Sequence, residues 1–221
     1  MAYDEFIYIA ELIGVSVFAI TGALAAQGKR MDTLGVVVLA IVTSLGGGTI
    51  RDITLDSYPL GWVVNTTYLW TAIWSAVAAF LLCRYFQYPR RLMLILDAAG
   101  LALFAILGAE KALMLDASPT IVVMMACITG AAGGMIRDVL TGQIPLILHR
   151  DGELYATCAM LGAIFYVAFY GLIDQQILAV ISMLIIFATR LAAVFGDLNL
   201  PEFVVAGHRL EPNDEARNPK Q

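Results

Sequence analysis

Apolar residues dominate seven stretches of the chain, and polar residues gather in the short segments between them. The stretches cover about 6–26, 33–50, 62–83, 92–115, 119–137, 154–173 and 176–198. A transmembrane helix needs about 17–25 predominantly apolar residues, so each stretch is long enough to cross a bilayer. The pattern therefore predicts an all-α membrane protein with seven transmembrane helices.

The composition agrees with this pattern. Apolar and aromatic residues make up 60% of the chain and charged residues only 14%, against about a quarter charged in soluble domains. The net charge of −5 comes largely from the polar ends, and no basic stripe points to a nucleic acid. We expect a multi-pass protein of the inner (plasma) membrane, with lipids around it. The N-terminus lacks the basic region of a signal peptide, so the first stretch is expected to remain as a span.

Basic residues in the short loops predict the orientation, because such residues concentrate on the cytoplasmic side. They fall after the first, third and fifth stretches, which places all of them on one side of the membrane if the N-terminus is outside and the C-terminus is cytoplasmic. The residues are Lys29, Arg30, Arg84, Arg90, Arg91, His149 and Arg150.

A motif near the end of the second stretch, GGGTIRD at 46–52, returns near the end of the fifth stretch as GGMIRD at 133–138. Arg137 follows Arg51 by 86 positions (137 − 51), and this offset also matches other glycines, Pro59 with Pro145, and the acidic pair Glu11 and Asp97. Apolar sequences match by chance, but glycines, prolines and an Arg-Asp pair in one register indicate an internal repeat. Each copy holds three spans, an odd number, so the second copy must be inverted in the membrane.

The repeat divides the chain into four parts. We expect a first three-helix repeat over 1–91, a second, inverted three-helix repeat over 92–173, a seventh helix over 174–198 and a polar, disordered tail over 199–221.

The motif glycines predict kinked or unwound helices, because each glycine in a helix interior costs about 1 kcal/mol relative to alanine. Irregular backbone in a membrane is tolerated where it lines a water-filled cavity, which favours a pore-lining role. The alternative is close packing of helices, which small residues also allow. The glycines are Gly46, Gly47, Gly48, Gly130, Gly133 and Gly134.

Charged residues inside a span usually face the protein interior or water. The motif charges are expected to anchor the broken helices beside a pore; alternatively they are stop signals at the membrane interface. Adjacent residues on a helix do not face each other, so each is expected to bond to freed carbonyls or neighbouring spans. These residues are Arg51, Asp52, Arg137 and Asp138.

Three other sets of charged residues and one set of aromatic residues stand out. Glu11 and Asp97 open the first and fourth spans, where they would attract cations at a pore mouth or be interfacial carboxylates without a special role. Glu110 and Lys111 have no counterpart in the first repeat; they are a candidate gate or voltage-sensitive pair, or a snorkelling pair at a helix end. Arg190 requires a partner or a lipid headgroup. The remaining set is read as interface anchors: Trp62, Trp70, Trp74 and Tyr68.

The sequence contains no nucleophile motif, metal-ligand cluster or phosphate-binding loop. It therefore predicts that the protein is not an enzyme and needs no cofactor or metal.

Taken together, two inverted three-span units, a seventh helix and the motifs GGGTIRD and GGMIRD resemble the prokaryotic trimeric intracellular cation (TRIC) channels over about 6–198. The resemblance implies a homotrimer with one hourglass pore per protomer, lined by glycine-kinked second and fifth helices. It implies conduction of monovalent cations, chiefly potassium. In animal relatives a basic residue of the fourth helix is tied to voltage response, and Lys111 is the nearest candidate. The Lys-Glu-Val motif of the animal members is replaced here by Ile-Arg-Asp.

Two functions therefore follow from the sequence. The first is a potassium-preferring cation channel. The alternative is a secondary transporter for a small solute, because inverted repeats with broken helices also build carriers. A membrane scaffold would leave the paired glycines and the buried charges without an explanation.

Overall fold

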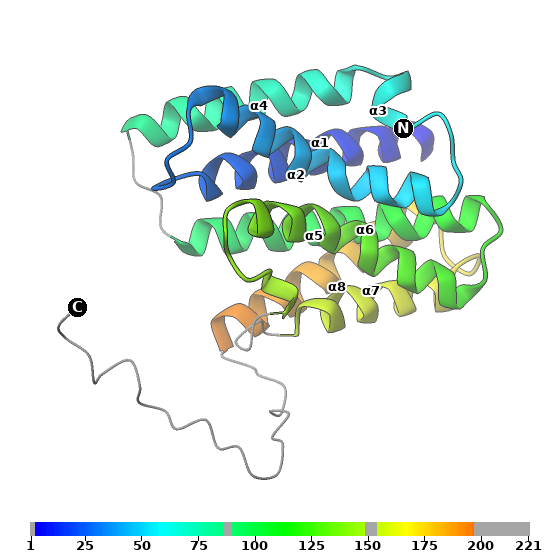
Figure 1. The fold of residues 1–221 in the computed structure, drawn as a ribbon. Coiled ribbons are helices and arrows are strands. Elements are labelled where there is room, and N and C mark those ends of the chain that lie inside the picture. Colours follow the sequence, from blue (N-terminus) through cyan, green and yellow to red (C-terminus); the bar gives the residue numbers. More distant parts are fainter. Residues whose placement is uncertain (1–2, 86–89, 149–153, 197–221) are drawn as a thin grey trace, which may run out of the picture.

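The computed structural model describes residues 3–85, 90–148 and 154–196. Its elements are helices joined by short turns (Figure 1). In chain order they are α1 (Tyr3–Ala25), α2 (Thr33–Thr54), α3 (Gly61–Val64), α4 (Thr67–Tyr85), α5 (Arg90–Met114), α6 (Pro119–Leu140), the 3₁₀ turn η1 (Leu146–Leu148), α7 (Tyr155–Phe169) and α8 (Gln175–Gly196). The tail predicted over 199–221 and the basic residues His149 and Arg150 lie outside the described residues.

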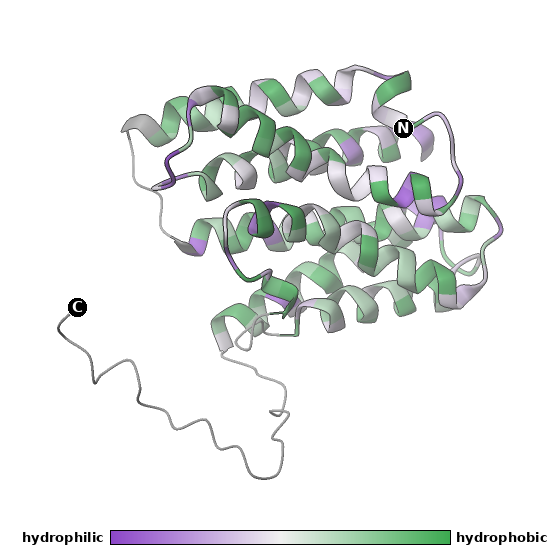
Figure 2. Ribbon diagram, in the orientation of Figure 1, coloured by the Kyte–Doolittle hydropathy of each residue, from purple (hydrophilic) through white to green (hydrophobic). Residues whose placement is uncertain are grey.

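The long helices lie side by side in one bundle, with α1, α2 and α4 in one half and α5 to α8 in the other (Figure 1). The halves meet where α2 packs on α6 and α1 packs on α5. Hydrophobic residues run along all the long helices (Figure 2), and many large hydrophobic side chains are exposed on the outside of the bundle. Within the described residues, α1, α2, α5, α6 and α8 are long and apolar enough to cross a membrane, and α4 and α7 contain shorter apolar segments. The all-helical membrane architecture predicted from the sequence is therefore confirmed.

The third apolar stretch, expected as one helix over 62–83, is divided. The one-turn helix α3 ends at Asn65, which has extended backbone angles, and α4 begins two residues later. The Asn65 side chain accepts a hydrogen bond from the Thr67 backbone N–H at 3.1 Å. Asparagine side chains favour turns and helix starts for this reason. The break separates α3, which lies against the end of α2, from the apolar helix α4.

Reciprocal contacts join the two halves at the glycines. A Cβ atom on Gly47 would lie 2.4 Å from the carbonyl oxygen of Thr129, and one on Gly133 would lie 2.3 Å from the carbonyl oxygen of Thr43. The two contacts are related by the same 86-residue offset as the motifs. Two further residues at this offset, Phe18 and Phe104, stack on each other with ring centroids 5.3 Å apart. The two halves of the bundle therefore meet through contacts at matching positions, with glycine letting the backbones of α2 and α6 approach.

The glycines do not unwind their helices. Helix α2 continues unbroken through Gly46, Gly47 and Gly48, and α6 continues through its own set. The unwinding predicted from the glycine content is wrong because helix–helix packing fixes the backbone that glycine leaves free. At Gly47 and Gly133 the contacts are those of the alternative, close helix packing.

Both motif helices end in the same way, just after the Arg-Asp pairs. A residue with positive φ follows each end: Asp56 at 52° and Gly142 at 69°. The next N–H, from Ser57 or Gln143, donates to the carbonyl of the motif aspartate at 2.8 Å. This is the hydrogen-bond pattern of a Schellman helix end. It turns the chain back so that the following segment lies beside the motif charges.

Candidate functional site

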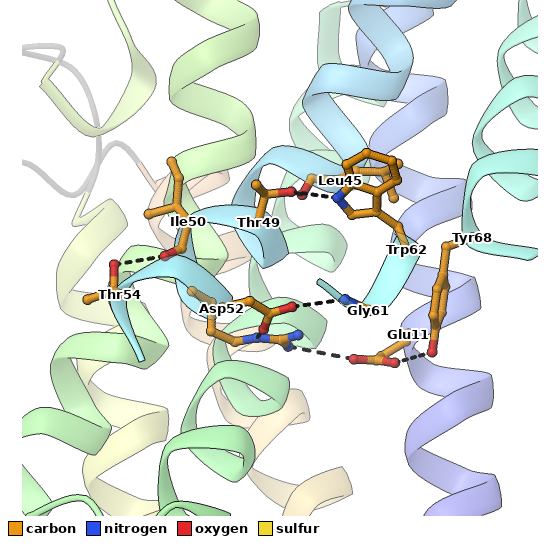
Figure 3. A network of polar contacts seen from close by, with 10 residues as sticks. Glu11, Leu45, Thr49, Ile50, Asp52, Thr54, Gly61, Trp62 and Tyr68 are labelled. Atoms are coloured by element: carbon orange, nitrogen blue, oxygen red, sulfur yellow. Dashed lines mark hydrogen bonds and ion pairs between the residues drawn. The ribbon is translucent and has the colours of Figure 1, made fainter. Parts of the chain in front are cut away.

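The first motif site, which comprises Glu11, Arg51, Asp52, Trp62 and Tyr68, gathers around one arginine. The Arg51 Nε lies 2.8 Å from Asp52 Oδ1, and its Nη1 lies 3.6 Å from Glu11 Oε1. The Tyr68 hydroxyl donates to the other oxygen of Glu11. Figure 3 shows Glu11, Asp52 and Tyr68, from α1, α2 and α4, gathered in this region. The site is at the hydrophilic end of α2 visible in Figure 2.

The turn after α2 closes this site. Asp52 Oδ2 accepts a hydrogen bond from the Gly61 backbone N–H at 3.3 Å. The Trp62 indole N–H donates to Thr49 Oγ1 at 3.0 Å (Figure 3). These two bonds hold α3 against α2. Trp62, predicted from the sequence as an interface anchor, therefore forms part of the site wall.

A cavity of about 50 Å³ opens among these side chains. A single buried water needs roughly 10–15 Å³ on this measure, so the cavity has room for several waters or one small solute. Charged, aromatic and apolar groups surround it: Glu11, Val15, Ser44, Leu45, Gly48, Arg51, Asp52, Gly61, Trp62, Tyr68 and Phe104.

The second motif site, which comprises Asp97, Gly134, Arg137, Asp138 and Tyr155, repeats the arrangement in a tighter form. Arg137 Nη1 lies 2.8 Å from Asp97 Oδ1, and its Nε lies 2.9 Å from Asp138 Oδ1. Asp138 Oδ2 accepts from the Leu146 backbone N–H at 3.0 Å, as Asp52 does from Gly61. The Arg137 and Asp97 side chains are 0% and 1% exposed, and the site has no room for a water.

The expectation that the adjacent Arg and Asp would bond only elsewhere is wrong. In both sites the arginine Nε bonds the neighbouring aspartate. The Cβ atoms of neighbours diverge on a helix, but an arginine side chain is long enough to fold back once its aspartate is held by the following turn. The other part of the expectation is met, since Arg51 also reaches α1 and Arg137 also reaches α5.

The remaining predicted residues take different places. Asp97 is buried under Arg137, so it does not lie at an open mouth, whereas the side chain of Glu11 is 23% exposed. Glu110 is buried and accepts a hydrogen bond from Tyr166, while Lys111 is partly exposed. Arg190 is buried and lies over the Tyr155 ring, 4.8 Å from its centroid. Neither Glu110 nor Lys111 belongs to a motif site.

The sequence did not indicate Tyr155, and it indicated Tyr68 only as an interface anchor. Tyr68 bonds Glu11 in the first site. In the second site, Tyr155 lies beside the same space as Asp97 and Arg137. The two tyrosines are 87 residues apart, one more than the repeat offset, so a gapless comparison of the halves does not pair them. An alignment of the two halves of the chain that allowed one extra residue before α7 would have paired Tyr155 with Tyr68.

Each motif site holds two carboxylates around one guanidinium. These three groups have a formal charge of −1 when ionised, and at the second site the guanidinium of Arg190 also lies close by, over the Tyr155 ring. Oxygen-rich sites of negative charge attract monovalent cations. Within residues 3–85, 90–148 and 154–196 there is no group of three or more His, Cys, Asp or Glu that could hold a metal ion.

A family model described as "Glycine transporter" matches this chain over residues 8–84 and 94–171. The two matched segments begin 86 residues apart, which is the offset of the motifs. The chain is also similar to the UPF0126 inner membrane protein YadS of Escherichia coli K12. The two are 41% identical over 202 residues, which cover 90% of this chain and 97% of YadS.

Solved structures of two cation channels share the fold. One is the TRIC trimeric intracellular cation channel orthologue from Rhodobacter sphaeroides, 38% identical, with a TM-score of 0.81 over 86% of this chain and 98% of that chain. A second, from work on conductance through TRIC cation channels, is 35% identical, with a TM-score of 0.81 over 94% of this chain and 100% of that one.

Proposed function

This chain belongs to the family described as glycine transporters, and to that of the TRIC channels, and from that premise we propose that it conducts monovalent cations across the inner membrane. The observation that carries the proposal is the pair of motif sites, in each of which two carboxylates surround one arginine, at the C-terminal ends of α2 and α6. The ions are potassium in preference to sodium. The protein is not an enzyme.

The pathway runs between the two motif sites, along α2 and α6. The repeats are inverted in the membrane, so the two sites lie toward opposite faces, with the first outside and the second toward the cytoplasm. Gly48 and Gly134, which border the two motif sites, line the pathway, with bends at Gly46–Gly48 and Gly133–Gly134, while Gly47 and Gly133 hold α2 and α6 together. Three protomers form a homotrimer in which each protomer holds its own pathway. The similarity to a TRIC trimeric intracellular cation channel orthologue supports the trimer.

A second candidate function is transport of a small amino acid. The family description favours it, and so does the first cavity, which combines a guanidinium with carboxylates in about 50 Å³. A zwitterion such as glycine carries the two complementary charges. For this function, the two motif sites would lie at the two ends of the transport pathway.

Recordings from the purified protein in planar bilayers separate the two functions. We expect discrete unitary currents in symmetric KCl, with a reversal potential that follows the potassium gradient when NaCl replaces KCl on one side. Uptake of labelled glycine into proteoliposomes, measured on the same preparation, tests the transporter. Saturable glycine uptake without unitary currents would show that the protein is a transporter and not a channel.

Glu11→Gln is expected to lower the unitary potassium conductance. Removing this charge takes the first site from −1 to neutral, and a charged cleft raises the local counter-ion concentration by roughly tenfold or more at low salt. The loss should therefore be largest in dilute KCl and shrink in concentrated KCl, where screening is strong. Glu5→Gln is the matched control, because Glu5 is an exposed residue in the first turn of the same helix. Equal conductance of the two variants in dilute KCl would remove Glu11 from the pathway.

A further inference from the structure

Glu110 is a buried carboxyl group that stands apart from both motif sites. Among the described residues, three other carboxyl groups are buried, and each bonds a motif arginine: Asp52, Asp97 and Asp138. Glu110 is 2% exposed and forms no ion pair with any arginine or lysine in residues 3–85, 90–148 and 154–196. Its hydrogen-bond partner is the hydroxyl group of Tyr166. An ionised carboxylate without a cation is costly in an apolar interior, and such a group is neutralised by taking up a proton.

Two tyrosines connect Glu110 to the surface. The Tyr166 hydroxyl donates to Glu110 Oε2 and lies 3.3 Å from the Tyr3 hydroxyl, within hydrogen-bond reach. Tyr166 is fully buried, whereas Tyr3, the first residue of α1, is only partly buried. A phenol hydroxyl both donates and accepts, so these hydrogen bonds can run from Tyr3 to Glu110 or in the reverse direction. The three groups form a continuous chain from the start of α1 through α7 to the buried face of α5.

The ionisable groups around Glu110 on the adjoining helices are phenols. Tyr3 comes from α1 and Tyr166 from α7, where the Tyr170 ring lies 6.1 Å from that of Tyr166. Lys111 follows Glu110 on α5, but it is partly exposed and makes no ion pair with it. The charged residues of α2, α6 and α8, which also pack on α5, belong to the motif sites or lie beside them: Arg51, Asp52, Arg137, Asp138 and Arg190. The remaining charged residues near this end of the helices are exposed: Asp4, Glu5, Asp116 and Asp174.

We propose that Glu110 is a proton-binding site that exchanges with water at the N-terminal end of α1 through Tyr3 and Tyr166. In the uptake step, the Tyr3 oxygen accepts a proton from water while its own proton passes to the Tyr166 oxygen, and the Tyr166 proton passes to Glu110 Oε2. The carboxylate becomes a neutral carboxylic acid, and each phenol again carries one proton. Release follows the same steps in reverse.

This proton site is separate from the cation pathway proposed above. Glu110 follows Asp97 by 13 residues on α5 (110 − 97), about 20 Å along the helix. The bound proton keeps the contact between α1, α5 and α7 neutral. Its loss places a negative charge among buried groups and weakens the attachment of the first turn of α1, the helix that also carries Glu11.

Thermal unfolding of the purified full-length protein and of Glu110→Gln across a range of pH tests the proposal. Glutamine has nearly the same size, keeps an oxygen that accepts from Tyr166, and does not titrate. The folded protein keeps a proton that the unfolded chain releases above about pH 4.3, where an exposed glutamate ionises. A rise in pH should therefore lower the unfolding midpoint of the wild type relative to that of Glu110→Gln. Glu5→Gln, at an exposed position of α1, should show no such trend. A difference between wild type and Glu110→Gln that stays constant with pH would overturn the proposal.

Infrared spectroscopy detects the bound proton directly, because the C=O stretch of a carboxylic acid is resolved from that of a carboxylate. We expect the wild type to show a carboxylic acid band at neutral pH, and we expect Glu110→Gln to lose it. A wild-type spectrum without this band at neutral pH would overturn the proposal even if the variant did not fold.

The same band tests the tyrosine path. After transfer into heavy water, the band shifts as deuterium replaces the proton on the carboxyl group. Tyr3→Phe should keep the band and slow this shift, because it removes the hydroxyl that meets water and leaves Tyr166 on Glu110. Tyr8→Phe, the same change at another partly buried position of α1, should leave the rate unchanged. A wild-type rate in Tyr3→Phe would overturn the proposed path.

Discussion

Gly133→Ala is expected to destabilise the protein strongly, and Gly47→Ala is expected to do the same. The added Cβ would lie 2.3 Å from the Thr43 carbonyl oxygen in the first case and 2.4 Å from that of Thr129 in the second. Real atoms do not approach so closely, and the obstacle is helix backbone, which cannot rotate away. Overpacking typically costs about 1–3 kcal/mol and sometimes more. The two helices must move apart along the whole interface between the repeats.

The measurement is the thermal unfolding midpoint of the purified protein in detergent, together with its elution volume. Gly48→Ala is the matched control, because it adds the same methyl group one helical position away with no neighbour closer than 3.9 Å. Alanine favours a helix by about 1 kcal/mol over glycine, so this variant should be neutral or slightly more stable. Unfolding of Gly133→Ala at the wild-type temperature would mean that α2 and α6 do not meet at these glycines.

These glycines also show why the sequence was informative on some points and misleading on others. Their positions revealed the repeat, because a residue required at a backbone contact recurs wherever that contact recurs. Their effect on the helix was overestimated, because intrinsic helix propensity is a weak preference that packing overrides. Spacing along one chain cannot distinguish a glycine that loosens a helix from one that lets another helix approach.

The charged residues give a similar lesson. Arg51 and Arg137 could be assigned to protein interiors from the cost of placing charge in a membrane. Their partners Glu11 and Asp97 stood out in the sequence because they occupy matching positions, 86 residues apart, in the two halves of the chain. The difference between the sites could not be predicted, since the motifs are nearly identical. It depends on how closely the surrounding helices pack, which leaves a cavity in one half and none in the other.

That difference in packing predicts unequal effects of the same substitution. Arg137→Ala is expected to be more destabilising than Arg51→Ala. It leaves the buried Asp97 and Asp138 without their cation, and breaking a buried pair in this way costs about 3–5 kcal/mol. Arg51→Ala also leaves a buried aspartate, Asp52, but the other carboxylate, Glu11, is 23% exposed and keeps its hydrogen bond from Tyr68. Water reaches that carboxylate, so the cost should be smaller.

Unfolding midpoints of the two single variants test this order, and both should also alter potassium currents. Arg209→Ala, a substitution outside the described residues, is the control expected to change neither property. The double variant Arg137→Ala with Asp97→Ala should recover part of the lost stability, because it removes an uncompensated buried charge along with its partner. Equal destabilisation by Arg51→Ala and Arg137→Ala, with no recovery in the double variant, would show that the two sites are electrostatically equivalent. The tighter packing around Arg137 would then have no measurable effect on stability.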